Sequence, residues 1–292
     1  MKTHLVIGAS GLVGGHLMKA APKAGVRALG TYRGNPVDGM EWADIREPKH
    51  LHALLDRLRP AVIHLAAAAS NVDYCQLHPE ETYATNVMGV KNVVDGANAV
   101  GAKIVYFSTD FVFDGKAGPY GEEDTANPIC EYGRQKFMAE HHIALHACDY
   151  LIVRTTVVYG WERQGKNFIY RLVNTLKAGD VLKAPVDQVG SPTYAPNLAE
   201  AALELAAADR RGVFHVVGPD RANRYEFACE AAKAFGLNPG LVQPVSTADL
   251  NQAAPRPLNA GMLCDKAAAA LHVRLIGYRD GLRAMAAEGE RR

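Results

Sequence analysis

The sequence lacks the features that would point to nucleic acid, to a membrane or to an oxidising compartment. Its charge is balanced, with 32 Lys and Arg against 31 Asp and Glu in 292 residues, so no attraction to nucleic acid or to a charged membrane surface is expected. The five cysteines form no Cys-x-x-Cys pair, which argues against a disulfide framework and against zinc. No apolar run approaches the length of a membrane span, and no secretory leader is recognisable. We therefore expect a cytoplasmic protein.

Histidine is plentiful, with 11 residues, but its spacing does not build a metal site. His142 and His146 have the i, i+4 spacing of two ligands on one helical face. Neither a glutamate directly after His142 nor a third ligand nearby completes the set, so we expect a solvated helix face and no bound metal.

Apolar runs alternate with segments of helical character through the first half of the chain. The apolar runs cover about residues 3–8, 26–31, 61–66, 103–108 and 150–154. The helical segments cover about residues 12–23, 47–59, 80–100 and 131–147. Such alternation predicts an α/β fold of the Rossmann type, a doubly wound parallel sheet with helices on both faces. After residue 160, glycines and prolines break this rhythm, which predicts a smaller C-terminal lobe.

A glycine-rich turn follows the first predicted strand. Gly8, Gly11 and Gly14 lie between the apolar run His4–Ile7 and the first helical segment. Glycine permits such a turn and lets backbone N–H groups approach a pyrophosphate at the start of a helix. Because glycines also make ordinary turns, the spacing G-x-x-G-x-x-G alone leaves both interpretations open.

The end of the second predicted strand bears on the choice of dinucleotide. NAD sites commonly place a carboxylate there, about 20 residues beyond the glycine turn, to bind the ribose hydroxyls. This chain has Arg33 in that region and no carboxylate between Gly30 and Gly34. A guanidinium pairs with a 2′-phosphate, which favours NADP(H), with NAD(H) as the second choice.

Tyr132 and Lys136 are spaced to share one face of a helical segment near the middle of the chain. An ammonium beside a phenol is expected to lower the phenol pKa from about 10, which suits Tyr132 to exchange a proton with a substrate oxygen. Thr109 ends a predicted strand and can hydrogen-bond to the same oxygen. A Tyr-x-x-x-Lys pair also occurs by chance on surface helices, and Thr109 is what favours the catalytic interpretation.

The order of Thr109, Tyr132 and Lys136 resembles the catalytic set of the extended short-chain dehydrogenase/reductase family. Within that family the chain resembles the dTDP-4-dehydrorhamnose reductases, from about residue 3 to about residue 283. The segments that carry this resemblance are 108–115, 119–124, 128–136, 154–160, 167–168, 187–193, 225–228 and 256–260. The resemblance implies NAD(P)H-dependent reduction of a 4-keto group on a nucleotide-activated deoxysugar, as in dTDP-rhamnose biosynthesis, with Tyr132 as proton donor.

The resemblance also implies the residues of the site. For the cofactor they are Gly8, Ser10, Gly11, Leu12, Val13, Tyr32, Arg33, Asp44, Ile45, Leu65, Ala66 and Ala67, together with Tyr132 and Lys136. For the sugar nucleotide they are Asp110, Phe111, Asn167, Gln188 and Arg256. Residues 1–160 are implied as the NADP(H)-binding domain and 161–292 as mainly the substrate-binding lobe, with about 196–215 returning to the first domain. A homodimer is a further expectation.

Two departures from the reductase pattern leave the identity of the sugar open. Phe111 stands where these reductases usually have tyrosine, and Val157 stands where they often have tryptophan. Phe111 also argues against a 4,6-dehydratase, which is expected to carry a carboxylate at that position for the elimination of water.

Two alternative functions stay open at this point. The segments 212–215, 224–229 and 256–260 also resemble the regulatory beta subunit of methionine adenosyltransferase, which binds NADP and acts as a partner protein. A sugar-nucleotide epimerase of the same family would retain its cofactor and show no net oxidation of NADPH. Each alternative would share the fold and the tyrosine with a reductase.

Overall fold

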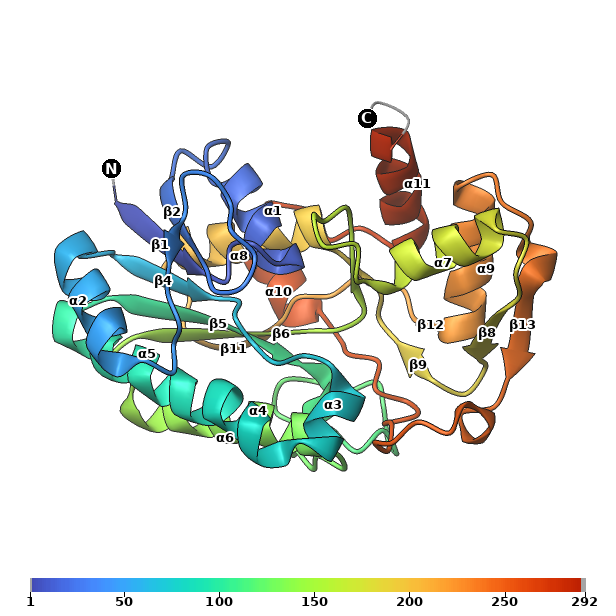
Figure 1. Ribbon diagram of the computed structural model, residues 1–292, viewed down its shortest axis with the longest axis horizontal. Helices are drawn as coiled ribbons and strands as arrows, with labels where there is room; N and C mark the ends of the chain where they lie inside the picture. Colours follow the sequence, from blue (N-terminus) through green and yellow to red (C-terminus); the bar gives the residue numbers. More distant parts are fainter. Residues whose placement is uncertain (1, 290–292) are drawn as a thin grey trace.

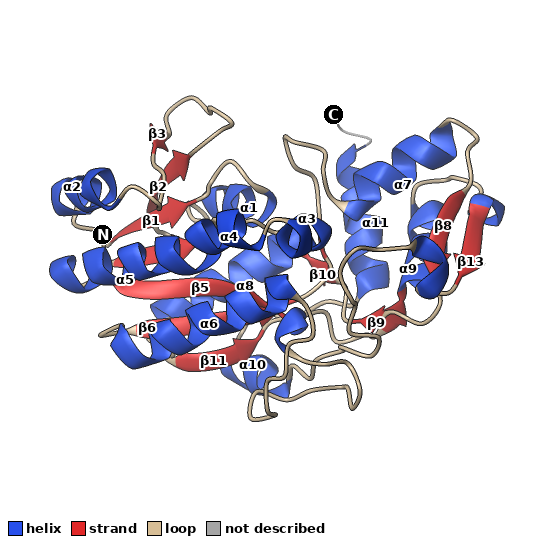
Figure 2. Cartoon of the chain, turned by 60° about the horizontal axis from the view of Figure 1, so that its bottom comes forward, coloured by secondary structure: helices blue, strands red, loops and turns tan. Residues whose placement is uncertain are grey.

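A seven-stranded parallel sheet forms the centre of the larger part of the molecule (Figures 1 and 2). The computed structural model describes residues 2–289. Across the sheet the strands are β11 (Gly212–His215), β6 (Tyr150–Thr155), β5 (Lys103–Thr109), β4 (Val62–Leu65), β1 (Thr3–Ile7), β2 (Arg27–Tyr32) and β3 (Glu41–Trp42). Every neighbouring pair runs parallel, so the predicted Rossmann-type fold is confirmed.

Helices cover both faces of the sheet. One face carries α1 (Leu12–Ala20) and α8 (Ala195–Ala207), which share a core with β1 and β5. The other carries α2 (Pro48–Leu58), α5 (Gly89–Val100) and α6 (Glu131–His146). Figure 2 shows α5 and α6 in front of the strands and running alongside them. Because both faces are covered, β4 and β5 are buried along their whole length, which explains their continuous apolar runs. None of the helices between residues 2 and 289 is long and apolar enough to cross a membrane.

The strand order reverses at β1. The chain builds β2 and β3 on one side of β1 and then crosses to place β4, β5, β6 and β11 on the other. In an open parallel sheet, ligands bind in the crevice beyond the carboxyl ends of the strands at such a reversal. The turn after β1 and the segment after β4 are therefore the expected borders of a site.

The helix predicted over residues 80–100 is divided in three. It consists of α4 (Pro79–Tyr83), a π-helical turn (Ala84–Met88) and α5, preceded by the short α3 (Val72–Leu77). A π-turn adds one residue to a helical turn and is frequent at functional sites. The turn contains the buried residues Thr85 and Asn86.

The C-terminal lobe lies beside the carboxyl end of the sheet, on the right of Figure 1. Its helices are α7 (Phe168–Lys177), α9 (Arg224–Ala234) and α11 (Tyr278–Gly289). Its strand pairs are β7 (Val158–Tyr159) with β10 (Thr193–Tyr194), β9 (Val189–Gly190) with β12 (Ala222–Asn223), and β8 (Leu182–Pro185) with β13 (Val242–Val245). Apolar side chains of these elements, with Phe227 and Leu172 among the buried ones, form a core separate from those of the sheet.

The chain crosses between the sheet and the lobe more than once. After the lobe strands β7 to β10 it forms α8, which packs on α1, and β11, which pairs with β6. It then enters the lobe again at β12, and a short helix, α10 (Asp265–Ala270), lies close to β11. The domain limits 1–160 and 161–292, with 196–215 returning to the first domain, stay predictions.

Candidate functional site

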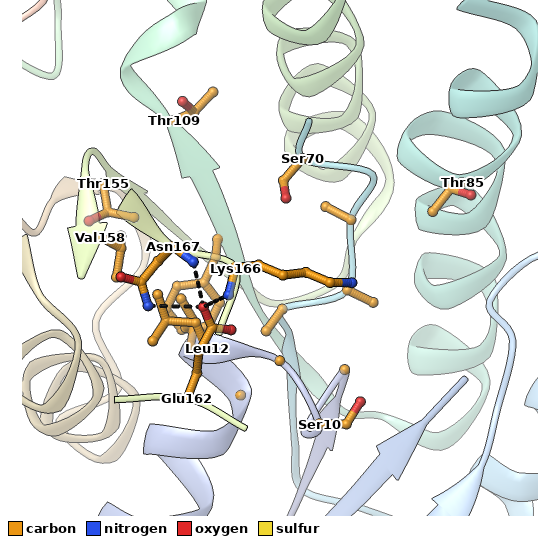
Figure 3. Close-up of a pocket in the computed structure, with 18 of the residues that line it drawn as sticks. Ser10, Leu12, Ser70, Thr85, Thr109, Thr155, Val158, Glu162, Lys166 and Asn167 are labelled. Atoms are coloured by element: carbon orange, nitrogen blue, oxygen red, sulfur yellow. Dashed lines mark hydrogen bonds between the residues drawn. The ribbon is translucent and has the colours of Figure 1, made fainter. Parts of the chain in front are cut away.

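A cavity of about 660 Å³ lies at the carboxyl ends of the sheet strands, where they face the lobe. This volume is within the usual range of small-molecule and cofactor sites. Its lining comes from the ends of β1, β4, β5 and β6, the start of α6, and the lobe segment before α7. Figure 3 shows side chains from these elements around one space, with Thr109 and Thr155 on the left, Ser10 at the lower right, and Lys166 beside Asn167 near the centre.

The glycine turn between β1 and α1 borders this cavity. Gly8 has φ +87°, a conformation that other residues rarely adopt, and a Cβ on Gly14 would lie 2.7 Å from the Cα of Ala9. Gly11 precedes α1 without a side-chain cap, and Leu12 and Val13 at the start of the helix line the cavity. Uncapped N–H groups at a helix start suit a phosphate, so this turn fits the dinucleotide that the sequence predicts.

Two buried hydroxyls on the opposite side also fit a polar ligand. The residues Ser108 and Thr155 line the cavity, and their buried hydroxyl oxygens have no hydrogen-bond partner in the described part of the chain. Buried polar atoms are normally paired, so these two hydroxyls could bind a ligand after a small rotation of their side chains.

The residues predicted to bind the adenine end of the cofactor lie together at the ends of β2 and β3. Tyr32, Arg33, Asp44 and Ile45 all line the cavity, and Arg33 is exposed. Burial opposes ionisation of Asp44, but hydrogen bonds from Arg46 at 2.6–3.0 Å and the nearby charge of Arg33 outweigh it, so the pKa of Asp44 is lowered. Asp44 is therefore a carboxylate near Arg33, and Arg46 holds it in place.

The segment after β4 supplies the opposite wall. Ala66 and Ala67 line the cavity, while Leu65, also predicted there, is buried in the core between the sheet and α5. Asn86 lies behind this wall: its Oδ1 accepts from the N–H of Ala69 at 2.8 Å and its Nδ2 donates to the carbonyl of Ala69 at 3.0 Å. Its Nδ2 also lies 2.9 Å from Gln135 Oε1 on α6, so Asn86 supports the wall from outside the cavity.

Tyr132 and Lys136 project from the first two turns of α6 into the cavity lining. Lys136 Nζ donates to the carbonyl of Phe107 at 2.7 Å and lies 4.0 Å from the ring centre of Tyr106. Burial lowers the pKa of Lys136 to about 7, although the nearby Glu140 favours the charged form. The Lys136 Nζ atom is therefore held beside the end of β5.

The expected lowering of the Tyr132 pKa was wrong. Burial, and then the nearby carboxyl of Asp110, raise the pKa of the phenol well above its usual value, while a hydrogen bond with the Thr109 side chain acts in the opposite direction. Desolvation is the largest of these effects, and it outweighs the hydrogen bond that favours the ionised phenol. Tyr132 consequently keeps its proton at neutral pH.

Thr109, Asp110 and Phe111 lie where β5 ends and a 3-10 turn begins. Thr109 Oγ1 is 3.0 Å from Asp110 Oδ1 and accepts from the N–H of Phe111 at 3.2 Å. Phe111 meets the Tyr132 ring edge to face, with centroids 5.7 Å apart. All three line the cavity beside Tyr132, as does Asn167, whose Oδ1 also caps α7 by accepting from Ile169 at 3.1 Å.

Two predicted sugar contacts lie outside the residues that line this cavity. Gln188 Nε2 donates to Thr247 Oγ1 and Gln252 Oε1, both at 3.0 Å. Arg256 Nη2 donates to Asp73 Oδ2 on α3 at 2.8 Å. These side chains connect parts of the lobe to each other and to the sheet domain, and their contact with a substrate stays a prediction.

Several lining residues were missed by the sequence reasoning: Ser70, Thr85, Thr156, Glu162, Gln164, Lys166 and Arg224. Arg224 is the first residue of α9, next to a capping box of Asn223 and Glu226 that the sequence pattern could have revealed. Glu162 accepts from the backbone of Lys166 and Asn167 at 3.1 and 2.8 Å, as Figure 3 shows. Gln164 reaches across the cavity to the Ser10 carbonyl at 3.1 Å, a contact that no local pattern predicts.

Comparisons with known proteins agree with this geometry. The model of a family described as "RmlD substrate binding domain" matches residues 1–291. A dTDP-4-dehydrorhamnose reductase of Sinorhizobium fredii is 33% identical over 235 residues, which cover 77% of this chain and 79% of that protein. The methionine adenosyltransferase 2 subunit beta of Xenopus tropicalis is 29% identical over 272 residues, 90% of this chain and 80% of that protein.

A solved structure is similar over nearly the whole length. The dTDP-4-dehydrorhamnose reductase of Bacillus anthracis, crystallised in complex with NADP, superposes with a TM-score of 0.89 at 27% identity. The match covers 99% of this chain and 100% of that chain.

Proposed function

This chain belongs to the RmlD substrate binding domain family, and from that premise we propose that it reduces a 4-keto group on a nucleotide-activated deoxysugar with NADPH. The observation that carries the proposal is the convergence of Thr109, Tyr132 and Lys136 on one cavity that the glycine turn also borders. The dTDP-4-dehydrorhamnose reductases similar to this chain support a dTDP-linked 4-keto sugar as substrate.

The cofactor would lie across the carboxyl ends of the strands. The helix start at Leu12 and Val13 would hold its pyrophosphate, Arg33 its 2′-phosphate, and Lys136 its nicotinamide ribose. When bound, NADPH would supply the hydride that adds to the carbonyl carbon. The NADP in the similar Bacillus anthracis structure supports NADP(H) as the preferred cofactor, and NAD(H) stays the second choice.

The chain's own residues would handle the proton. Tyr132 gives its phenolic proton to the carbonyl oxygen as negative charge develops there, which is general acid catalysis. Thr109 hydrogen-bonds to the same oxygen and polarises the carbonyl. Phe111, which packs against Tyr132, and Val157 line the space where a sugar would lie and leave that wall apolar.

The experiment that tests the proposal is the oxidation of NADPH by the purified protein with dTDP-4-dehydrorhamnose, followed by identification of the sugar product. We expect stoichiometric conversion of NADPH and keto sugar to NADP and the 4-hydroxy sugar. Tight NADPH binding without turnover on this or related nucleotide-linked keto sugars would contradict the proposal. A protein that changes the sugar configuration with no net loss of NADPH would instead be an epimerase.

A second candidate is a regulatory role like that of the methionine adenosyltransferase beta subunits. The observation that favours it is the 29% identity to the Xenopus tropicalis protein along 90% of this chain. A regulatory subunit would bind NADP(H) and a partner protein, and its effect on that partner would not depend on Tyr132. The same assay separates the two candidates, because only the reductase consumes NADPH.

Replacing Arg33 with alanine is expected to raise the KM for NADPH by about 10- to 100-fold and to change the KM for NADH little. The estimate follows from the loss of one charge-assisted hydrogen bond to the 2′-phosphate, which NADH lacks. Steady-state kinetics with each cofactor checks it. Arg27→Ala is the matched control, because Arg27 is exposed at the opposite end of the same strand. An equal rise of KM for NADPH and for NADH would show that Arg33 does not bind the 2′-phosphate.

A further inference from the structure

Arg224 brings a positive charge to the cavity from the side of the lobe. It is the first residue of α9, it is partly buried, and it lines the cavity. Within residues 2–289 its guanidinium makes no hydrogen bond and no ion pair. We propose that Arg224 binds the phosphate attached to the sugar of the substrate and thereby selects nucleotide-linked sugars over free sugars. The inference rests on the proposed function and deepens it by naming the group through which the substrate is recognised.

A partly buried guanidinium without a partner is unusual. Charged groups that are withdrawn from water are normally paired, because hydrogen bonds or an opposite charge must replace their lost hydration. Burial lowers the pKa of Arg224, as do the charges of Arg256 and Arg171, while the charge of Asp110 acts in the opposite direction. A guanidinium nevertheless stays charged at neutral pH. An anion in the cavity would therefore balance an excess of positive charge.

The charged residues around Arg224 leave its guanidinium available to a ligand. The charge of Asp110 acts on Arg224, but in the described part of the chain the Asp110 carboxyl forms no ion pair. Arg256 is already engaged, because its Nη2 donates to Asp73 Oδ2 at 2.8 Å. Arg171 on α7 is exposed, and both it and Arg256 lie outside the residues that line the cavity. Arg224 is thus the member of this group of arginines that a ligand in the cavity can reach.

The start of α9 holds Arg224 in place. The N–H of Arg224 donates to the carbonyl of Gln188 at 3.1 Å. Asn223 Oδ1 accepts from the N–H of Glu226 at 2.8 Å, and Glu226 Oε2 accepts from the N–H of Asn223 at 3.1 Å. This capping box fixes the first turn of the helix. The backbone under the guanidinium is therefore already ordered before a ligand binds, which reduces the entropy cost of binding.

The position of Arg224 assigns it to the substrate rather than to the cofactor. Arg33 and Lys136, which are proposed to hold the cofactor, lie after β2 and on α6, both beside the sheet. Arg224 lies in the lobe, and its charge acts on Asp110, the residue directly after Thr109. It therefore approaches the proposed carbonyl site from the side opposite the sheet.

The chemistry of a sugar nucleotide matches this position. In a pyranose ring C1 lies directly across from C4, so a C4 carbonyl held by Tyr132 and Thr109 directs C1 away from these two residues. C1 carries the phosphate. A guanidinium suits that group because its planar fork donates parallel N–H···O hydrogen bonds to phosphate oxygens. Arg224 would thus bind the sugar-linked phosphate while the opposite side of the ring meets the catalytic residues.

The first test compares the binding of dTDP and dTMP to the natural protein and to Arg224→Ala, by calorimetric titration in the presence of NADP. The two nucleotides differ only in the phosphate that would carry the sugar. Loss of the charge-assisted contact should raise the Kd of dTDP by about 10- to 100-fold and that of dTMP by less than about threefold. We therefore expect the natural protein to prefer dTDP and the variant to lose this preference.

Two further variants serve as controls. Arg171→Ala removes a positive charge from the same neighbourhood but outside the cavity lining, so it should change both Kd values little and equally. Arg224→Lys keeps the charge and loses only the planar fork, so its Kd for dTDP should lie between those of the natural protein and the alanine variant. If Arg224→Ala does not fold, an unchanged Kd for dTDP in Arg224→Lys would still contradict the proposal.

Three other results would overturn the proposal. Equal rises of Kd for dTDP and dTMP would show that Arg224 supports the site as a whole. A higher KM for the keto sugar nucleotide with both Kd values unchanged would place Arg224 against the sugar ring. Variants that oxidise NADPH and keep the preference for dTDP would refute the role of Arg224 and leave the proposed function standing. If the natural protein binds neither dTDP nor the keto sugar nucleotide, the proposed function itself fails.

Discussion

The replacement Tyr132→Phe is expected to lower kcat for keto-sugar reduction by roughly 10²- to 10⁴-fold, the usual contribution of a general acid. The change removes only the hydroxyl. The ring, which meets Phe111 edge to face at 5.7 Å, stays in place, so NADPH binding should change little. Steady-state kinetics together with a fluorescence titration of NADPH checks both parts of this expectation.

Tyr32→Phe is the matched control for that experiment. Tyr32 lines the same cavity from the end of β2, at the predicted adenine end, and its hydroxyl has no role in the proposed proton transfer. We expect kcat of this variant to stay near that of the natural protein. If Tyr132→Phe keeps more than about a tenth of the natural kcat, a different group must supply the proton.

The replacement Glu140→Ala is expected to lower the stability of the fold strongly. Glu140 on α6 forms an ion pair with Arg154 on β6, with N···O distances of 2.7–3.2 Å, and both residues are at least 95% buried. Removing the carboxylate leaves a buried guanidinium without its counter-charge, which typically costs about 3–5 kcal/mol. For a chain of this size that corresponds to a fall in Tm of about 10 °C, measurable by thermal or urea unfolding.

Two comparison variants test whether burial of the ion pair is what makes its loss costly. Glu230→Ala removes two surface ion pairs, with Lys233 on α9 and with Arg279 on α11, and each is expected to contribute less than about 1 kcal/mol. The double replacement Glu140→Leu with Arg154→Met removes both buried charges and should recover much of the lost stability. If Glu140→Ala is no more destabilising than Glu230→Ala, burial does not determine how much the Glu140–Arg154 pair contributes to the free energy of unfolding.

Much of the fold followed from the alternation of apolar and helical segments. The strands β1, β2, β4, β5 and β6 and the helices that connect them match the predicted segments closely, because each buries a long apolar run or stripe. The two-residue strands of the lobe could not be predicted in the same way, since two residues carry no periodic signal. Their pairing is set by tertiary contacts between distant segments.

The parts of the candidate site that consist of residues close together in the sequence could be predicted. The glycine turn and the pair Tyr132 and Lys136 each lie within one turn and one helix, so their spacing alone indicates their geometry. Arg224 and Gln164 reach the cavity from the lobe, and no local pattern indicates such a long-range approach. The sign of the Tyr132 pKa shift was missed for a related reason: helical spacing indicates the neighbouring ammonium but not the burial that outweighs it.

The π-turn at Ala84–Met88 gives one continuous helix two separate orientations. On its far side α5 turns Val90 and Val93 into the core beneath the sheet, and within the turn Asn86 points to Ala69 behind the cavity wall. One residue changes the direction of a helical side chain by about 100°, so the extra residue of the π-turn rotates Asn86 relative to Val90 and Val93. The π-turn thus sets the direction of Asn86 separately from that of the apolar side chains of α5. The helix can pack on the sheet and support the cavity wall at Ala69 at the same time.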